Sequence, residues 1–139
     1  MRIVVGGVSR KCGKTSLVCR LIELAPERRW LAVKVSHHEP DNGAAYQLLE
    51  ETQPGESGDT RRYLASGAAR SYWLRGDLAA GLPELRALLA GAENWIVEST
   101  RAGWLLESDL SLVVQAPGQM KDAELLDLLR NGGQEHAER

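Results

Sequence analysis

The feature that most constrains the fold is a short apolar run that leads through glycines into a helical pattern. Residues 3–5 (Ile-Val-Val) carry β-branched side chains without a polar residue, which is typical of a strand buried on both faces of a parallel sheet. From Gly13 to about Glu23, apolar residues recur at three- and four-residue intervals and predict an amphipathic helix. Because a strand feeds directly into a helix, we expect an α/β domain with parallel strands.

The rest of the chain alternates in the same way. The predicted strands are 30–35, 71–74, 94–97 and 110–114, and the predicted helices are 59–68, 82–89 and 123–129. The stretch 37–57, which contains prolines and glycines, is predicted to be mostly loop with a helical turn around 44–49. We therefore expect a three-layer α/β fold in which helices cover both faces of a mostly parallel central sheet.

Size and composition are those of a single compact domain over residues 1–139, with 131–139 as a frayed tail. The two cysteines, Cys12 and Cys19, are too few and too close for a disulfide framework, which favours a reducing cytoplasm. A formal charge of −2 gives no electrostatic reason to expect nucleic acid or a membrane surface as a partner. No apolar run approaches the roughly 18 to 20 residues of a membrane span, and the start of the chain lacks a secretory apolar region.

The segment between the first strand and the first helix predicts a phosphate site. Backbone N–H groups and a helix start can surround phosphate oxygens there, while Lys14 adds a positive charge and Thr15 offers a hydroxyl to Mg²⁺. In the pattern G-x-x-x-x-G-K-[ST], Val8 stands at the first glycine and Gly7 comes one residue early. We predict binding of a nucleoside triphosphate with Mg²⁺. The expected contact residues are Gly7, Ser9, Arg10, Lys11, Cys12, Gly13, Lys14, Thr15 and Ser16.

Two acidic residues are candidates for the metal environment. Glu98 ends an apolar strand, so its carboxylate is expected at the carboxyl edge of the sheet, where it could hold Mg²⁺ or position a nucleophile. The alternative is a solvated acid at the end of a strand. Asp59 is a second metal candidate and equally an ordinary helix N-cap. Lys34 interrupts an apolar strand, and its burial requires an ionic partner or access to the sheet edge.

Further residues are candidates for contact with a ligand. His37 and His38 follow the second strand and are predicted to contact substrate or phosphate, or simply to face solvent; a shared metal is disfavoured because adjacent side chains point in opposite directions on an extended chain. Arg101, beside Glu98, is the arginine retained as an anion contact. Trp104 and the following leucines form either a patch for a ligand or second subunit, or part of the core. Both cysteines are interpreted as small apolar residues rather than redox thiols.

Four segments, taken in order, resemble the MobB-like P-loop proteins, the nucleotide-binding adaptor family of molybdenum-cofactor biosynthesis. The segments are Gly13-Lys14-Thr15, the stretch from Lys34 to His38, Asp59-Thr60 with Ser66-Gly67-Ala68, and the stretch from Glu98 to Arg101. The resemblance spans about residues 1–101. It implies a P-loop NTPase-like fold that binds GTP or ATP with Mg²⁺, with Lys14 and Glu98 as catalytic residues and Thr15, Glu98 and Asp59 around the metal.

The resemblance also implies slow hydrolysis in an adaptor for the synthesis of molybdopterin guanine dinucleotide. Its partners would be a molybdopterin-type cofactor, an enzyme of that synthesis or a second copy of the chain. Two alternatives stay open: a small-molecule kinase whose acceptor lies in the 37–57 region, and a switch that retains nucleotide without turnover. Residues 116–122 contain no Asn/Thr-Lys-x-Asp segment of the kind that selects guanine, so the choice between ATP and GTP stays open.

Overall fold

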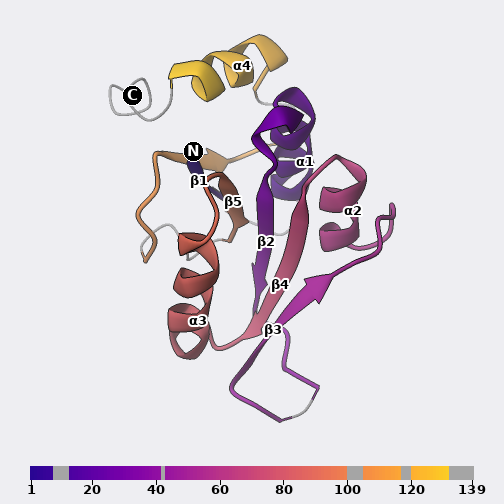
Figure 1. Cartoon of the computed structure of the whole chain (residues 1–139), viewed down its shortest axis with the longest axis vertical. Coiled ribbons are helices and arrows are strands. Elements are labelled where there is room, and N and C mark those ends of the chain that lie inside the picture. Colours follow the sequence, from indigo (N-terminus) through magenta and orange to yellow (C-terminus); the bar gives the residue numbers. More distant parts are fainter. Residues whose placement is uncertain (8–12, 42, 100–104, 117–119, 132–139) are drawn as a thin grey trace.

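A computed structural model describes residues 1–7, 13–41, 43–99, 105–116 and 120–131 of the chain (Figure 1). Its elements are β1 (Arg2–Gly7), α1 (Lys14–Leu24), the 3₁₀ helix η1 (Pro26–Arg28), β2 (Leu31–Ser36), β3 (Tyr46–Glu51), α2 (Asp59–Ala65), β4 (Arg70–Gly76), α3 (Leu78–Ala90), β5 (Trp95–Glu98), β6 (Leu110–Val114) and α4 (Asp122–Asn131). The predicted helices and strands are confirmed within a few residues at their ends, apart from the 37–57 region. No helix in these described ranges has the length and apolar character needed to cross a bilayer.

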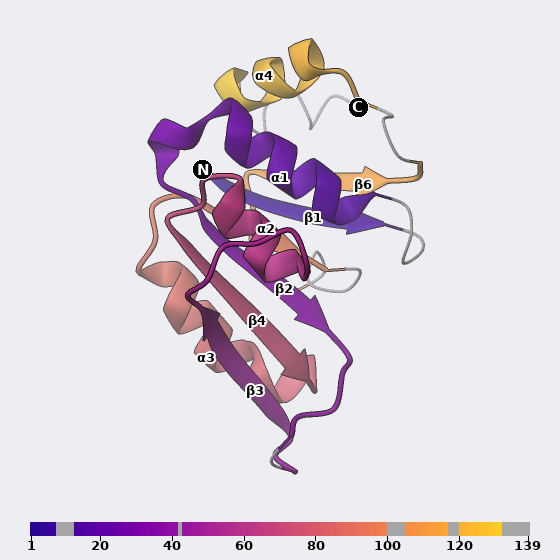
Figure 2. The same ribbon diagram turned by 90° about the vertical axis from the view of Figure 1, so that its right-hand side faces the viewer.

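The strands form one six-stranded sheet in the order β3-β4-β2-β5-β1-β6. The five strands β4, β2, β5, β1 and β6 run parallel, and β3 pairs antiparallel with β4. Helices α1 and α2 cover one face of this sheet and α3 covers the other, while α4 lies against α1 (Figure 2). The expectation of an α/β fold with a mostly parallel sheet and helices on both faces is therefore confirmed.

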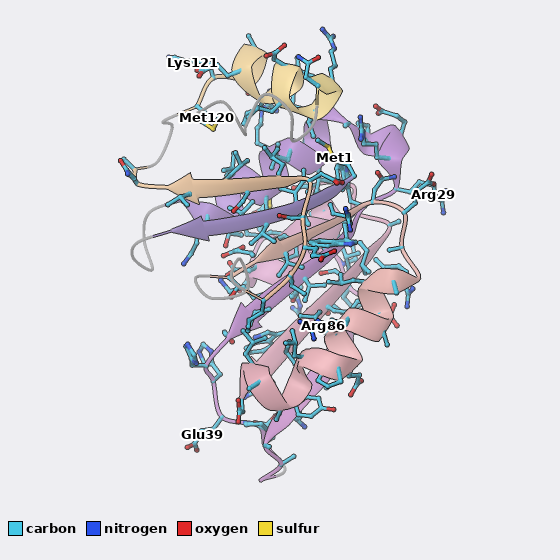
Figure 3. All side chains as sticks on the ribbon, turned by 90° about the vertical axis from the view of Figure 1, so that its left-hand side faces the viewer. Met1, Arg29, Glu39, Arg86, Met120 and Lys121 are labelled. Atoms are coloured by element: carbon cyan, nitrogen blue, oxygen red, sulfur yellow. The ribbon has the colours of Figure 1, made fainter. Side chains whose placement is uncertain are left out.

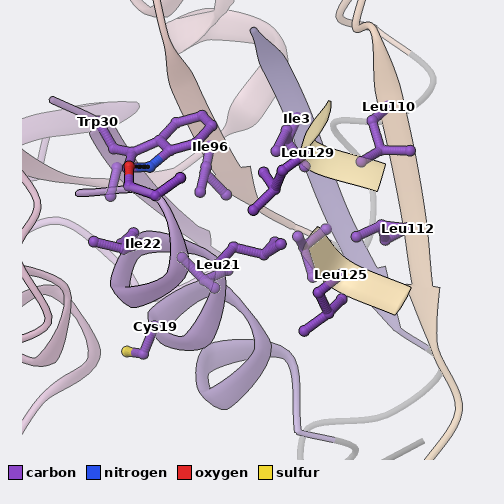
Figure 4. Close-up of a cluster of buried hydrophobic side chains, with 14 of the residues drawn as sticks. Ile3, Cys19, Leu21, Ile22, Trp30, Ile96, Leu110, Leu112, Leu125 and Leu129 are labelled. Atoms are coloured by element: carbon purple, nitrogen blue, oxygen red, sulfur yellow. Dashed lines mark hydrogen bonds between the residues drawn. The ribbon is translucent and has the colours of Figure 1, made fainter. Parts of the chain in front are cut away.

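Two apolar cores lie on the opposite faces of the sheet because successive strand residues alternate between them. Ile3 and Ile96 point to the face of α1 and α4, where Leu21 and Leu125 pack against them (Figure 4). The indole of Trp30 is buried in the same cluster and donates a hydrogen bond to the carbonyl of Ala25 at 2.9 Å. The opposite cluster joins alternate residues of β1, β2, β4 and β5 to the leucines of α3.

The prediction for 44–49 is wrong, because Tyr46–Glu51 is a strand rather than a loop with a helical turn. Tyr46 and Leu48 pack toward the α3 core, whereas Leu49 lies on the other face and is 40% exposed. The apolar and polar residues of this segment alternate too weakly to predict a strand. Pairing with the free edge of β4 supplies the missing hydrogen bonds, so tertiary structure overrides the local pattern.

Candidate functional site

The candidate site lies at the carboxyl edge of the central strands. Glu98 is the last residue of β5 and stands in register with Val5 of β1 on one side and Lys34 of β2 on the other. Helix α1 begins at Lys14, shortly after β1, and its first turn reaches the same edge (Figure 2). The parallel sheet therefore brings together residues that are far apart in the sequence.

The carboxylate of Glu98 is the centre of the site. Glu98 is 1% exposed, so its interpretation as a solvated acid at the end of a strand is wrong. The Thr15 hydroxyl donates toward both carboxylate oxygens at 2.9 Å each, and the Lys34 ammonium donates to Oε2 at 2.7 Å. The buried hydroxyl of Tyr63 donates to Oε1. These donors compensate for the removal of the carboxylate from water.

Lys34 has the partners that its place in an apolar strand requires. In addition to its contact with Glu98, its Nζ lies 2.9 Å from Oδ2 of Asp59. Burial lowers the pKa of Lys34, but the two carboxylates raise it by more, and the net pKa lies above its ordinary value of 10.5. Lys34 is therefore a cation that links the two acidic residues predicted to surround the metal.

The interpretation of Asp59 as a helix N-cap is wrong. Gly58, with φ of 96°, occupies the cap position, and Asp59 is the first residue of α2. No side-chain hydrogen bond caps this helix. The carboxylate of Asp59 instead pairs with Lys34. The sequence alone does not distinguish an Asp at the first helical position from an Asp at the N-cap, because both stand directly before an amphipathic run.

Tyr63 is a site residue that the sequence analysis missed. It is fully buried, and burial followed by the nearby charge of Glu98 raises its pKa well above the ordinary value of 10.0. Tyr63 therefore remains a neutral hydrogen-bond donor. One signal could have identified it: Tyr63 follows Asp59 by four residues, so both side chains lie on the same face of a helix.

The beginning of α1 supplies the phosphate-binding candidates that the structure describes. Gly13 has φ of 97°, a left-handed conformation that favours glycine, and its carbonyl accepts the first helical hydrogen bond from Leu17. Lys14 is 8% exposed, and its ammonium makes no hydrogen bond or ion pair with any residue in the described ranges. Ser16 is exposed and accepts a hydrogen bond from Arg62 at 3.4 Å.

Of the predicted phosphate contacts that precede α1, the structure describes Gly7 and Gly13. Gly7 ends β1 in register with Val114 of β6. The predicted contacts Ser9, Arg10, Lys11, Cys12 and Arg101, together with Val8 and Trp104, lie outside the described residues. The same holds for 132–139 in the predicted tail.

The two histidines do not meet at one place. Both are exposed, and His37 lines a hollow of 550 Å³ together with Gly76 and Asp77. His38 lines a different pocket; its Nδ1 lies 3.0 Å from Oγ of Ser36, and its ring contacts the Trp73 ring edge-on. This separation agrees with the argument that adjacent side chains point apart on an extended chain.

Cys19 has the environment of a structural thiol. It lies on the buried side of α1 and is 7% exposed, and burial raises the pKa of its thiol above the ordinary value of 9.0. The interpretation as a small apolar residue is confirmed for this cysteine.

Glu98 and Thr15 offer only oxygen atoms, the donors that Mg²⁺ prefers. Within the described ranges, no three His, Cys, Asp or Glu residues form a group that could hold a metal ion. Comparison with protein-family models found no match, and comparisons with curated proteins and with solved structures found no significant match.

Proposed function

We propose that the protein is a P-loop protein that binds a nucleoside triphosphate with Mg²⁺, hydrolyses it slowly and acts as an adaptor in molybdenum-cofactor biosynthesis. One observation carries the proposal: Thr15, at the start of the first helix, lies 2.9 Å from both oxygens of the Glu98 carboxylate at the end of a central strand. A hydroxyl and a carboxylate joined in this way are the protein ligands that a nucleotide-bound Mg²⁺ needs.

Lys14 supports the phosphate part of the proposal. A buried ammonium is costly unless an anion compensates it, and Lys14 has no anionic partner among the described residues. It lies beside Thr15 in the first turn of α1, where the backbone N–H groups of a helix have no acceptor within the helix itself. A polyphosphate would satisfy both requirements, and Mg²⁺ would neutralise the charge of the terminal phosphate oxygens when bound.

The adaptor role is supported by the convergence of separate segments. Thr15, Lys34, Asp59 and Glu98 come from the four segments that resemble the MobB-like family, and they form one connected cluster. A test of this role is expression in a bacterium that lacks its own adaptor of this family. We expect recovery of a molybdoenzyme that requires the dinucleotide form of the cofactor, and no recovery with Lys14→Met.

The nucleotide site is tested directly by thermal unfolding with ATP, GTP, ADP and GDP, each with and without Mg²⁺. A ligand at about 100 times its Kd stabilises the folded state by about 2.7 kcal/mol, which raises Tm by roughly 10 °C for a domain of this size. Lys14→Met should abolish the shift, and Thr15→Ala should abolish its dependence on Mg²⁺.

The matched control is Arg29→Gln, which removes one positive charge from an exposed residue at the opposite end of the sheet (Figure 3). This variant should keep the full shift. The proposal fails if no nucleotide raises Tm, or if Lys14→Met responds as the unmodified protein does.

Phosphate release then separates the candidate roles. Steady release without an added acceptor supports the slow NTPase. Nucleotide binding without release over hours supports the switch. One observation favours it: Thr15, Lys34 and Tyr63 already donate hydrogen bonds to the carboxylate of Glu98. Phosphate transfer to a small molecule supports the kinase, and the pocket that Lys34 shares with Trp73 favours that alternative.

A further inference from the structure

A second pocket opens next to the Glu98 cluster, on the side of β2 away from β5. Its volume is 420 Å³ and its walls are mainly apolar. The residues that carry the argument are Lys34 and Ser36 of β2, His38 after that strand, Asp59 and Arg61 of α2, and Trp73 of β4. Lys34 both lines this pocket and contacts Glu98, so it belongs to the two neighbouring sites.

The pocket exists because α2 is too short to cover its part of the sheet. Helix α2 and strand β4 beneath it each have seven residues. Because a strand residue advances about twice as far along its axis as a helical residue, the helix is about half as long as the strand. Lys34 stands in register with Trp73, and Trp73 with Leu49, so these side chains share the face that α2 leaves open.

The indole of Trp73 is held as a fixed, flat wall. Its Nε1 donates a hydrogen bond to Oγ of Ser36 at 2.7 Å, which satisfies its polar atom. The guanidinium of Arg75 lies over the ring, 4.6 Å from its centroid, and the ring of His38 meets it edge-on at 5.6 Å. Trp73 lines the pocket, and Arg75 is not among its lining residues.

Charged side chains of both signs line this pocket: Lys34 and Arg61, with the carboxylates of Asp59 and Glu51. Lys34 pairs with Asp59 and stays protonated, and its side chain is 22% exposed. Arg61 is 52% exposed, and its Nε makes only a long contact of 3.5 Å with Glu51, so its guanidinium can turn to a ligand at little cost. A planar guanidinium suits a carboxylate or a phosphate.

We infer that this pocket binds a small molecule that carries a flat aromatic ring and a carboxylate or phosphate group. The ring stacks on Trp73, and the anionic group reaches Lys34 and Arg61. The pocket itself does not depend on nucleotide binding. Its role as the place of a second ligand beside the triphosphate rests on the proposed function, because Lys34 and Glu98 connect the two sites.

The test uses the full chain without nucleotide and three probes: 2-naphthoate, 2-naphthamide and cyclohexanecarboxylate. The readout is the indole N–H resonance of Trp73 in ¹⁵N NMR, identified from a Trp73→Phe variant. We expect 2-naphthoate to shift this resonance in a saturable manner. The neutral amide and the non-planar acid should each bind about tenfold more weakly. The indole resonance of Trp95, in the core on the other face of the sheet, should not move.

Variants separate the pocket from surface binding and from the nucleotide site. Arg61→Gln should weaken 2-naphthoate severalfold, whereas Arg86→Gln, on α3 at the opposite face, should not (Figure 3). Lys14→Met should bind 2-naphthoate as the unmodified protein does, even though it is expected to lose nucleotide. Absence of a shift at Trp73, equal shifts at Trp73 and Trp95, or equal binding of the three probes would overturn the inference and leave the nucleotide proposal intact.

Discussion

Replacing Lys34 with methionine should destabilise the protein far more than the loss of a surface ion pair does. Methionine keeps the length and much of the apolar stem of lysine but removes the ammonium that lies 2.7 Å from Glu98 and 2.9 Å from Asp59. The carboxylate of Glu98, in a residue 1% exposed, would then be a buried anion without a cation beside it.

The size of the effect follows from burial and from the remaining donors. Removal of one partner of a buried ion pair typically costs about 3–5 kcal/mol. Lys34 is 22% exposed rather than fully buried, and Thr15 and Tyr63 still donate to Glu98, so we expect a loss of about 2–3 kcal/mol. The double variant Lys34→Met/Glu98→Gln removes the uncompensated charge and should recover at least about 1 kcal/mol of this loss.

The assay is urea unfolding of the single and double variants, with unchanged m-values as the check that the unfolding reaction is the same. Arg2→Met is the matched control. It breaks the exposed pair of Arg2 with Asp109, in which the side chains are 45% and 37% exposed, and should cost no more than about 1 kcal/mol. A Lys34→Met loss as small as that of the control, or a double variant less stable than Lys34→Met, would refute the reasoning.

Three further predictions follow from particular residues. The folded-state pKa of Lys34 lies above its ordinary 10.5, so the stabilisation by this group is complete below pH 10.5 and disappears as the pH rises through the folded-state pKa. In urea unfolding at increasing alkaline pH, the unmodified protein should therefore lose more stability than Lys34→Met. Gly76→Ala should cost at least about 2 kcal/mol, because φ is 101° and the new Cβ would lie 2.5 Å from the Ala45 carbonyl oxygen, whereas Gly91→Ala meets nothing closer than 3.6 Å and should be nearly neutral. Cys19, buried and with a raised pKa, should react with iodoacetamide at least about tenfold more slowly than in the urea-unfolded chain, as followed by mass spectrometry of its peptide.

Local sequence patterns determined the element types and the general position of the site. A β-branched run such as 3–5 and a helical repeat such as that after Gly13 report burial directly, so their structures follow without knowledge of the rest of the chain. The same reasoning places Glu98 at the carboxyl edge, because it ends a buried strand, and requires a partner for Lys34, because an unpaired charge is costly to bury.

Tertiary structure decided which of these groups meet. Thr15 and Glu98 are 83 positions apart, and Lys34 and Glu98 are 64 apart, so their contacts depend on the strand order that places β5 between β2 and β1. The strand Tyr46–Glu51 forms because the edge of β4 offers unpaired backbone groups, and the Trp73 pocket forms because α2 stops short. Periodicity indicates how deeply each residue is buried. It carries no information about which distant residue becomes its hydrogen-bond partner or its ion-pair partner.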